Sequence, residues 1–302
     1  AYLGEQALPI VIKADGLAAG KGVIIAQTLQ EAETAVRDML SGNSFGDAGH
    51  RVVIEEFMTG EEASFIVIVD GKHALPFATS QDHKAAHDGD LGPNTGGMGA
   101  YSPAPVVTPD VFARAMEEVI MPTVRGMAAE GNPYVGFLYA GLMIDASGAP
   151  RVVEYNCRFG DPEAQPIMLR LQTDLVDLCE AALAGTLDTL QIEFDPRAAV
   201  GVVLAAGGYP DSYAKGAPIS GLDQPAPPDS KLFHAGTALG TDGAVVTSGG
   251  RVLCATALGA SVAQARQRAY DLVQRVSWEG MYCRRDIGWR AVAREQADNV
   301  AE

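Results

Sequence analysis

The segment from residue 152 to residue 163 constrains the fold of this chain more than any other. It reads VVEYNCRFGDPE, an apolar run that continues into polar residues at alternate positions. A period of two is that of a β-strand, so Glu154, Asn156 and Arg158 are expected on one face. The opposite, packed face would carry Tyr155, Cys157 and Phe159. The segment therefore predicts a strand that presents a carboxylate, an amide and a guanidinium together.

These three polar groups suit chemistry on phosphates. The oxygens of Glu154 and Asn156 are hard ligands, which suit Mg2+ bridging to phosphate oxygens. A neighbouring Arg158 suits the charge of a phosphoryl group in transfer. The pattern indicates nucleotide-dependent chemistry, although an edge strand with a solvated polar face explains the bare pattern equally well.

Residues 9–26 predict a β-hairpin whose loop could hold phosphate. Lys13 lies on the first apolar strand, and the loop contains three glycines and Lys21. Glycine lets backbone N–H groups approach a polyanion closely. The loop is not a P-loop, because its spacing is one residue short and Gly22 stands where Ser or Thr is needed. A glycine-rich turn with solvated lysines is the alternative.

Residues 51–70 predict two strands joined by a short connector. The first strand ends in Glu55 and Glu56, and the second begins just after Glu62. Such a connector can hold adenine against the backbone near Phe57, while Glu62 accepts from ribose hydroxyls. The alternative is that the four glutamates around this turn form a solvated surface.

Taken together and in this order, the segments resemble the phosphoribosylamine–glycine ligase family of ATP-grasp enzymes, also called glycinamide ribonucleotide synthetases. The matching motifs are KADGLAAGKG from Lys13, EEF from Glu55 with GEEAS from Gly60, GPNTGGMGAYSP from Gly92 and NCRFGDPE from Asn156. The resemblance runs from about Pro9 to about Gln296, so it covers nearly the whole chain.

The resemblance implies a reaction of ATP, glycine and 5-phosphoribosylamine to give ADP, phosphate and glycinamide ribonucleotide, an early step of purine synthesis. ATP would phosphorylate the glycine carboxylate, and the amine of phosphoribosylamine would attack the acyl phosphate. A carboxylate is a poor acyl donor, whereas the mixed anhydride is a good one. The protein must neutralise phosphate charge, hold the nucleophile in line and exclude water.

The resemblance also implies roles for individual residues. Lys13 and Lys21 would contact ATP phosphates, and Lys21 and Arg158 would act in phosphoryl transfer. Adenine would meet Glu55, Glu56 and the Phe57 backbone, with Glu62 on the ribose. Substrate contacts are expected from Asp82, Lys84, Asn94, Thr95, Gly97, Met98 and Asp161.

The expected cofactors are ATP and Mg2+ (or Mn2+), with Glu154 and Asn156 as the metal ligands. Many relatives have a further carboxylate ligand on the preceding strand, but residues 139–144 read YAGLMI and contain none. We therefore expect two protein ligands and leave the number of ions open. A zinc site at His83 and His87 is not expected, because glycines lie nearby and no third ligand is present. His87 is expected to be solvated.

The expected fold class is α/β (α+β), an ATP-grasp fold followed by a C-terminal mixed, β-rich domain. Residues 1–60 would form the lid subdomain, residues 61–193 the core with the metal and substrate site, and residues 194–302 the C-terminal domain. ATP would sit between the two grasp halves, and closure of the lid would exclude water.

Hydrophobic and turn patterns predict the individual elements. Helices are expected near residues 29–40, 109–130, 174–184 and 262–276. Strands are expected at 51–57, 64–69, 73–79, 136–144, 151–156, 198–206, 231–237, 244–248 and 251–258, besides the N-terminal hairpin.

Composition limits the remaining possibilities. At 302 residues and 47% hydrophobic, the chain can bury one large or two to three smaller cores. The net charge of -16 makes nucleic acid and anionic membranes poor partners. We expect no signal peptide and no membrane span, since no apolar run is long enough to span a bilayer. We expect a cytoplasmic monomer that binds only small-molecule substrates.

The four cysteines lack CxxC spacing and are expected to be reduced thiols. Cys157 lies beside the site, but alternation turns it away from Glu154 and Asn156. A core thiol is therefore favoured over a nucleophile.

The start of the chain departs from the family pattern. Relatives carry an α/β domain before the lid, with a glycine-rich loop thought to hold the phosphate of phosphoribosylamine. Residues 1–6 read like the tail of a helix, so we expect a truncated form. The alternatives are another ATP-grasp ligase, such as a carboxylate–amine ligase or a biotin-dependent carboxylase subunit, and a nucleotide-binding fragment without full activity.

Overall fold

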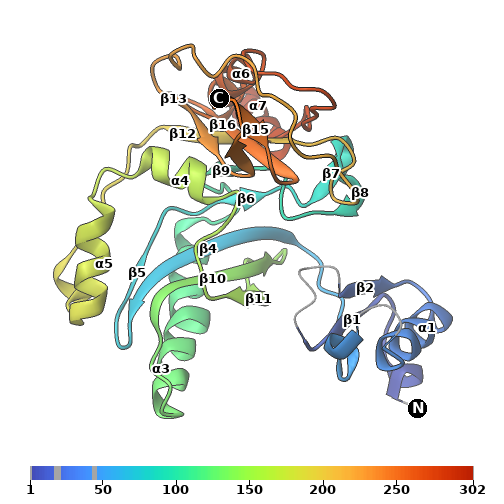
Figure 1. Cartoon of the computed structure of the whole chain (residues 1–302). Coiled ribbons are helices and arrows are strands. Elements are labelled where there is room, and N and C mark those ends of the chain that lie inside the picture. Colours follow the sequence, from blue (N-terminus) through green and yellow to red (C-terminus); the bar gives the residue numbers. More distant parts are fainter. Residues whose placement is uncertain (1, 17–21, 43–45, 302) are drawn as a thin grey trace. The chain divides into compact units, whose positions relative to one another are not determined.

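The computed structural model describes residues 2–16, 22–42 and 46–301. It divides into two compact units, Ala1–Thr59 and Gly60–Glu302. Figure 1 shows the elements of both units. No helix among the described residues is long and apolar enough to cross a membrane.

The first unit is a three-stranded antiparallel sheet covered by one helix. The sheet has the order β2-β1-β3, with the strands β1 Ile10–Ala14, β2 Val23–Ala26 and β3 Val52–Glu56. Helix α1 (Leu29–Leu40) matches the predicted range, and its N-cap Thr28 accepts from the Glu31 N–H. Alternate residues Ile10 and Ile12 of β1 pack with Met39 of α1. A short 3-10 turn, Tyr2–Glu5, precedes the sheet.

The second unit contains a four-stranded antiparallel sheet with the order β11-β10-β4-β5. Its strands are β4 Glu61–Asp70, β5 Ala74–Pro76, β10 Val135–Ile144 and β11 Pro150–Asn156. Strand β4 is buried on both faces because its alternate residues enter different cores. Phe65 and Val67 pack toward one core, and Ile66 and Ile68 pack toward the other.

Helices supply both of those cores. One core takes residues from a continuous helical stretch made of α2 (Pro109–Arg114), a π-helical turn (Ala115–Ile120) and α3 (Met121–Ala129). The other takes residues from α4 (Ala164–Arg170) and α5 (Leu175–Ala184). The sequence predicted the helical stretch and α5, but it did not predict α4 or the π-helical turn.

A five-stranded sheet has the order β13-β16-β12-β9-β6. Its strands are β6 Gln81–Asp82, β9 Gly99–Ser102, β12 Ala198–Ala205, β13 Ser230–His234 and β16 Arg251–Gly259. Strand β12 pairs with β16 on one side and with β9 on the other. The sheet therefore joins strands from both sides of residue 194. A domain boundary at that residue stays a prediction.

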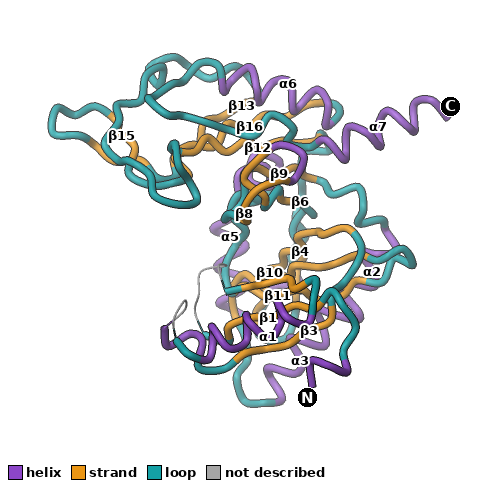
Figure 2. The backbone as a smooth tube through the Cα atoms, turned by 90° about the vertical axis from the view of Figure 1, so that its right-hand side faces the viewer, coloured by secondary structure: helices purple, strands orange, loops and turns teal. Residues whose placement is uncertain are grey.

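Helix α6 (Val262–Val273) packs on this sheet, and α7 (Trp289–Ala301) follows it. Figure 2 shows α6 and α7 near the β12–β16 strands. The remaining elements are short: η2 Gly46–Gly49, β7 Ala85–His87, η3 Asp88–Asp90, β8 Leu91–Asn94, η5 Leu187–Thr189, β14 Thr237–Leu239 and β15 Val245–Thr247.

The structure corrects the expected packing around the end of β11. The strand ends at Asn156, so Arg158 is not part of it. β11 is also an edge strand, and its outward residues remain accessible. Tyr155 is 40% exposed, and Cys157 is exposed. The expectation that Cys157 is a core thiol was therefore wrong.

Candidate active site

In the first unit, a cavity of about 400 Å3 lies beside the end of β3. It is lined by the three residues expected to meet adenine, Glu55, Glu56 and Phe57, together with Tyr2 and residues 6–10. Lys13 pairs with Glu55 at 2.5 Å between Nζ and Oε2, because β1 and β3 are antiparallel neighbours. Lys21, the other expected phosphate contact, lies outside the described residues.

In the second unit, the two expected metal ligands lie together at the end of β11. Asn156 Nδ2 is 3.4 Å from Glu154 Oε1. The neighbouring strand places Gly141 opposite Glu154, so no bulky side chain lies across from the carboxylate. Arg158 donates to the backbone oxygen of Phe159 at 2.8 Å. Within the described ranges, no hydrogen bond or ion pair joins Arg158 to Glu154 or Asn156.

Lys84 lies among the acidic groups of this site. Its Nζ is 2.6 Å from Oε2 of Glu62. Burial alone would lower the pKa of Lys84, but the negative charges of Glu62, Asp82 and Glu154 outweigh burial and raise this pKa above its ordinary value. The lysine is therefore positively charged and lies within electrostatic reach of three carboxylates.

The glycine-rich stretch packs against Lys84 and Asp82. Thr95 bonds the backbone oxygen of Lys84 through both its N–H (2.7 Å) and its hydroxyl (2.9 Å). The Gly97 N–H donates to the Thr95 hydroxyl at 2.9 Å. Gly97 is buried with φ +110°, and a Cβ there would collide with Pro162 and the Asp82 carboxylate. The position therefore requires glycine.

Asp82, which is half-buried, and Glu163, which is buried, form an acidic pair that the sequence analysis did not identify. Burial raises the pKa of Asp82 well above its ordinary value, and the charge of Glu163 raises it further. Glu163 is 2% exposed and accepts from the Ser64 hydroxyl at 2.6 Å. Tyr139 in turn bonds Ser64 at 3.0 Å. The motif ending in Glu163 was recognised, but its burial depends on strands β4 and β10.

Arg251, on β16, is a second residue that the sequence analysis missed. Its guanidinium donates to the backbone oxygens of Gly96 (2.5 Å) and Asp161 (2.8 Å). It also pairs with the Asp161 carboxylate at 2.9 Å. Tyr209 accepts from the Gly96 N–H at 3.0 Å. The C-terminal part thus holds the glycine-rich stretch and Asp161 in place.

Gln165, at the start of α4, has a buried oxygen without a partner. Its Nε2 donates to Asp161 at 3.3 Å, whereas Oε1 has no hydrogen-bond partner within the described ranges. An unsatisfied buried acceptor is costly, so this oxygen is suited to a donor group on a ligand.

The side chain of His83 is buried and contacts backbone groups through both of its ring nitrogens. It is 2% exposed, and its Nε2 accepts from the Gly288 N–H at 3.0 Å while Nδ1 lies 3.1 Å from the Gly99 oxygen. Burial and the positive charge of Arg284 lower the pKa of His83 to about 4, so the ring is neutral at pH 7. His87 is exposed, as expected.

Two of the residues expected to contact substrate differ in their exposure: Met98 is fully buried, and Asn94 is exposed. Met98 is fully buried in the core of the five-stranded sheet. Its backbone N–H donates to His83, and its backbone oxygen accepts from Val203. The structure thus gives Met98 a packing role. Asn94 lies at the exposed end of β8.

The donor set at the end of β11 fits Mg2+. One carboxylate and one amide supply two hard oxygens, and Mg2+ usually takes its other ligands from water and substrate phosphates. The described residues contain no group of three or more His, Cys, Asp or Glu residues arranged to hold a metal ion. A metal at this site would therefore depend on the nucleotide for part of its coordination.

Comparison with known families gives two matches along the chain. The ATP-grasp (A) domain of phosphoribosylglycinamide synthetase matches residues 1–164. The C domain of phosphoribosylglycinamide synthetase matches residues 199–290. Together the two matches include most of the residues described above.

Curated relatives agree with the family matches. The chain is 70% identical over 297 residues to phosphoribosylamine–glycine ligase of Vibrio cholerae serotype O1, covering 98% of this chain and 69% of the relative. It is 69% identical over 299 residues to the ligase of the same name from Pseudomonas aeruginosa, covering 99% and 70%.

Solved structures show the same fold. The crystal structure of phosphoribosylamine–glycine ligase from Thermotoga maritima superposes with a TM-score of 0.86 at 38% identity, covering 95% of this chain and 70% of the other. The biotin carboxylase domain of Hydrogenobacter thermophilus 2-oxoglutarate carboxylase, solved with MgADP and bicarbonate, has a TM-score of 0.67 at 16% identity, covering 93% and 60%. The second likeness concerns the fold alone.

Proposed function

The chain belongs to the phosphoribosylglycinamide synthetase family, and from this we propose how its own residues take part in the family's reaction. That reaction is the ATP-dependent ligation of glycine to 5-phosphoribosylamine. The observation that carries the proposal is the convergence of Glu62, Asp82, Lys84 and Glu154 in one part of the second unit.

We propose that Glu154 and Asn156 hold Mg2+ (or Mn2+) against the ATP phosphates. When bound, the metal would neutralise phosphate charge. Lys84 would supply a fixed positive charge beside it, since the surrounding carboxylates keep the ammonium protonated. Arg158 is exposed beyond the end of β11, and we propose that it contacts the transferred phosphoryl group.

The first unit is proposed to recognise the nucleotide. The cavity beside Glu55, Glu56 and Phe57 supports an adenine site, because it is small and joins apolar walls to backbone groups at the end of β3. Lys13 is proposed to exchange its ion pair with Glu55 for a phosphate contact. Lys21 is proposed as a second phosphate contact on the strength of the family motif alone. In the second unit, Glu62 is proposed to accept from the ribose.

The glycine-rich stretch is proposed to bind glycine and the amine substrate. Gly97 lets the backbone approach a small ligand, and Asp82 and Asp161 offer acceptors for an ammonium group. The free acceptor of Gln165 supports the same role. Asn94 and Thr95 would contribute further polar contacts. Residues 1–60, 61–193 and 194–302 are proposed as lid, core and C-terminal domain.

A binding assay and a turnover assay test this proposal. A fluorescent ATP analogue is titrated with and without Mg2+, and phosphate release is measured with glycine, with and without phosphoribosylamine. Metal-dependent nucleotide binding and glycine-dependent phosphate release support the assignment of residues. If Mg2+ does not change the affinity for the ATP analogue, Glu154 and Asn156 are not metal ligands. Size-exclusion chromatography and cell fractionation test the proposed cytoplasmic monomer.

A further inference from the structure

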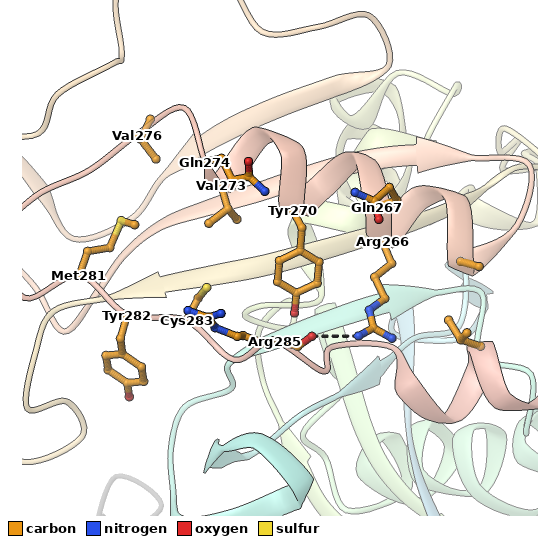
Figure 3. A pocket seen from close by; sticks show the side chains of 12 residues that line it. Arg266, Gln267, Tyr270, Val273, Gln274, Val276, Met281, Tyr282, Cys283 and Arg285 are labelled. Atoms are coloured by element: carbon orange, nitrogen blue, oxygen red, sulfur yellow. Dashed lines mark hydrogen bonds between the residues drawn. The ribbon is translucent and has the colours of Figure 1, made fainter.

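A cavity of about 930 Å3 lies in the C-terminal part of the second unit (Figure 3). Its walls come from α6, from residues 276–285 and from the start of α7. None of its lining residues belongs to the candidate active site. Its volume lies within the range of small-molecule pockets, roughly 300–1,000 Å3.

Two arginines line the cavity, one on each side of Tyr270 (Figure 3). Arg266 donates to the backbone oxygen of Arg285 at 2.9 Å, and its guanidinium lies 5.8 Å from the centre of the Tyr270 ring. A guanidinium has about five N–H donors, so most of those on Arg266 remain available. The side chain of Arg285 extends toward Cys283 (Figure 3), and the positive charge of Arg285 acts on that thiol.

Neither arginine has an ion-pair partner in the described part of the chain. Several other arginines of this region are ion-paired, as with Arg284 and Asp286 or Arg294 and Glu61, whereas Arg275 only donates to the backbone oxygen of Pro225. A neighbouring carboxylate, that of Asp88, accepts from the Arg285 backbone N–H at 2.7 Å, and that of Asp271 accepts from Gln267 at 2.9 Å. The lining itself contains no carboxylate. In a chain with a net charge of -16, two unpaired arginines at one cavity indicate an anionic ligand.

The part of the cavity farthest from Arg266 is apolar. Val276 and Met281 lie there, away from Arg266 (Figure 3). The Tyr270 hydroxyl is already satisfied, because it donates to Arg284 and accepts from Ile287. The tyrosine therefore offers mainly its ring to a ligand. The cavity is thus suited to a molecule that carries an anionic group and an apolar group.

We propose that this cavity binds a small phosphate monoester that carries an aromatic or apolar group. The phosphate lies between Arg266 and Arg285, because two guanidiniums match the charge and the oxygens of a phosphate dianion. The apolar group lies against Val276 and Met281. This would be a second ligand site of the chain, separate from the residues assigned to ATP, glycine and phosphoribosylamine.

Calorimetric titration with phenyl phosphate tests the proposal, with inorganic phosphate as the probe that lacks a ring. Saturating MgADP is present throughout, so that the nucleotide site is filled. The variants are Arg285→Gln and the double variant Arg266→Gln/Arg285→Gln. The control Arg37→Gln/Arg125→Gln removes the same charge at two exposed positions outside the lining. Arg285 is itself exposed, so its substitution should leave the melting temperature unchanged.

We expect phenyl phosphate to bind the unaltered chain more tightly than inorganic phosphate. The Kd should rise about tenfold in Arg285→Gln and about 100-fold in the double variant, as expected for lost charge-assisted hydrogen bonds. The control should change the Kd less than twofold. The proposal is overturned if the unaltered chain binds no phenyl phosphate at millimolar concentration, or if the double variant binds it equally well. If the unaltered chain binds phenyl phosphate and inorganic phosphate with equal affinity, the proposed contact of an apolar group with Val276 and Met281 is overturned.

Cysteine alkylation locates the bound probe. Cys283 lines the cavity and is half-buried, whereas Cys157 is exposed and lies outside it. Phenyl phosphate should slow iodoacetamide modification of Cys283, measured by peptide mass spectrometry, and leave the rate at Cys157 unchanged. Binding without protection of Cys283 would place the ligand elsewhere and overturn the assignment.

Discussion

Arg251 and Asp161 form an ion pair of 2.9 Å although 90 residues separate them along the chain. The same guanidinium reaches the backbone oxygen of Gly96. One side chain of β16 thereby holds two segments of the candidate active site, the glycine-rich stretch and the turn that follows β11. The geometry of both segments depends on a residue that neither motif contains.

Arg251→Gln should lower the free energy of unfolding by roughly 1.5–3 kcal/mol, because partly buried hydrogen bonds to a charged group are lost. Urea denaturation measures this loss, and Arg125→Gln at an exposed site is the control. In a double-mutant cycle with Asp161→Asn, the coupling should be about 0.5–2 kcal/mol. Strictly additive losses would show that the ion pair does not couple the two segments.

Glu154→Gln should weaken Mg2+-dependent binding of an ATP analogue at least tenfold, since an amide keeps the shape but not the charge of a metal ligand. Because Glu154 is exposed, stability should change by no more than about 0.5 kcal/mol. Glu180→Gln, at an exposed position of α5, is the control. Unchanged metal dependence would argue against Glu154 as a ligand.

Gly97→Ala should destabilise the chain by roughly 2 kcal/mol or more, because the position has φ +110° and the new Cβ meets Pro162 and Asp82. Gly126→Ala provides the opposite control. That glycine lies in α3 with open space around it, so alanine should stabilise by roughly 0.5–1 kcal/mol. Thermal melts of the two variants should therefore shift in opposite directions.

His83 should make the chain less stable in acid. Burial and Arg284 hold its pKa at about 4, below the ordinary 6.5, so the unfolded chain takes up a proton first as the pH falls. The free energy of unfolding should fall between pH 6.5 and 4, by at most roughly 3 kcal/mol from this group.

His83→Gln tests that contribution. The variant should be less stable at pH 7, because an amide fits the two hydrogen bonds less well, but it should lose less stability between pH 7 and pH 4.5. Denaturation at both pH values measures the difference. His87→Gln, at an exposed position, should keep the original pH dependence. An equal slope in His83→Gln would show that another group is responsible.

Asp82→Asn should stabilise the chain at pH 8 and weaken glycine-dependent turnover. The folded-state pKa of Asp82 is raised, so its contribution to stability is lost as the pH rises through that value. Asparagine removes the buried charge and keeps the oxygen that accepts from the His83 N–H. The gain in stability from Asp82→Asn should become smaller toward pH 4. Asp223→Asn, at an exposed position, should change neither the stability at pH 8 nor the glycine-dependent turnover. Reduced stability at pH 8 would contradict this account.

Local sequence patterns predicted most of the regular elements. Helix α1 and strands β10 and β12 appear where periodicity and flanking glycines or caps indicate them. The π-helical turn at residues 115–120 was missed because the apolar repeat runs through it, although Pro122 just after it has no N–H for the carbonyl of Glu118 four residues earlier. Helix α7 was missed as well.

The residues of the candidate site were predictable only where a motif contained them. Glu154 and Asn156 adjoin each other because a strand spaces them regularly. Arg251 and Glu163 were missed because their roles arise from tertiary contacts with Asp161 and Ser64, which no local pattern records. The exposure of Cys157 likewise depends on β11 lying at the sheet edge.

The pairing of β9 with β12 also governs how this protein can fold during synthesis. Residues 99–102 leave the ribosome long before residues 198–205 and 251–259, and domains fold as units once their partner segments have emerged. The strand after the glycine-rich stretch therefore pairs only with β6 until translation has passed most of the second unit. A nascent chain that stalls before β12 would present the apolar residues of β9 to solvent, and would be a target for chaperones rather than a partly active ligase.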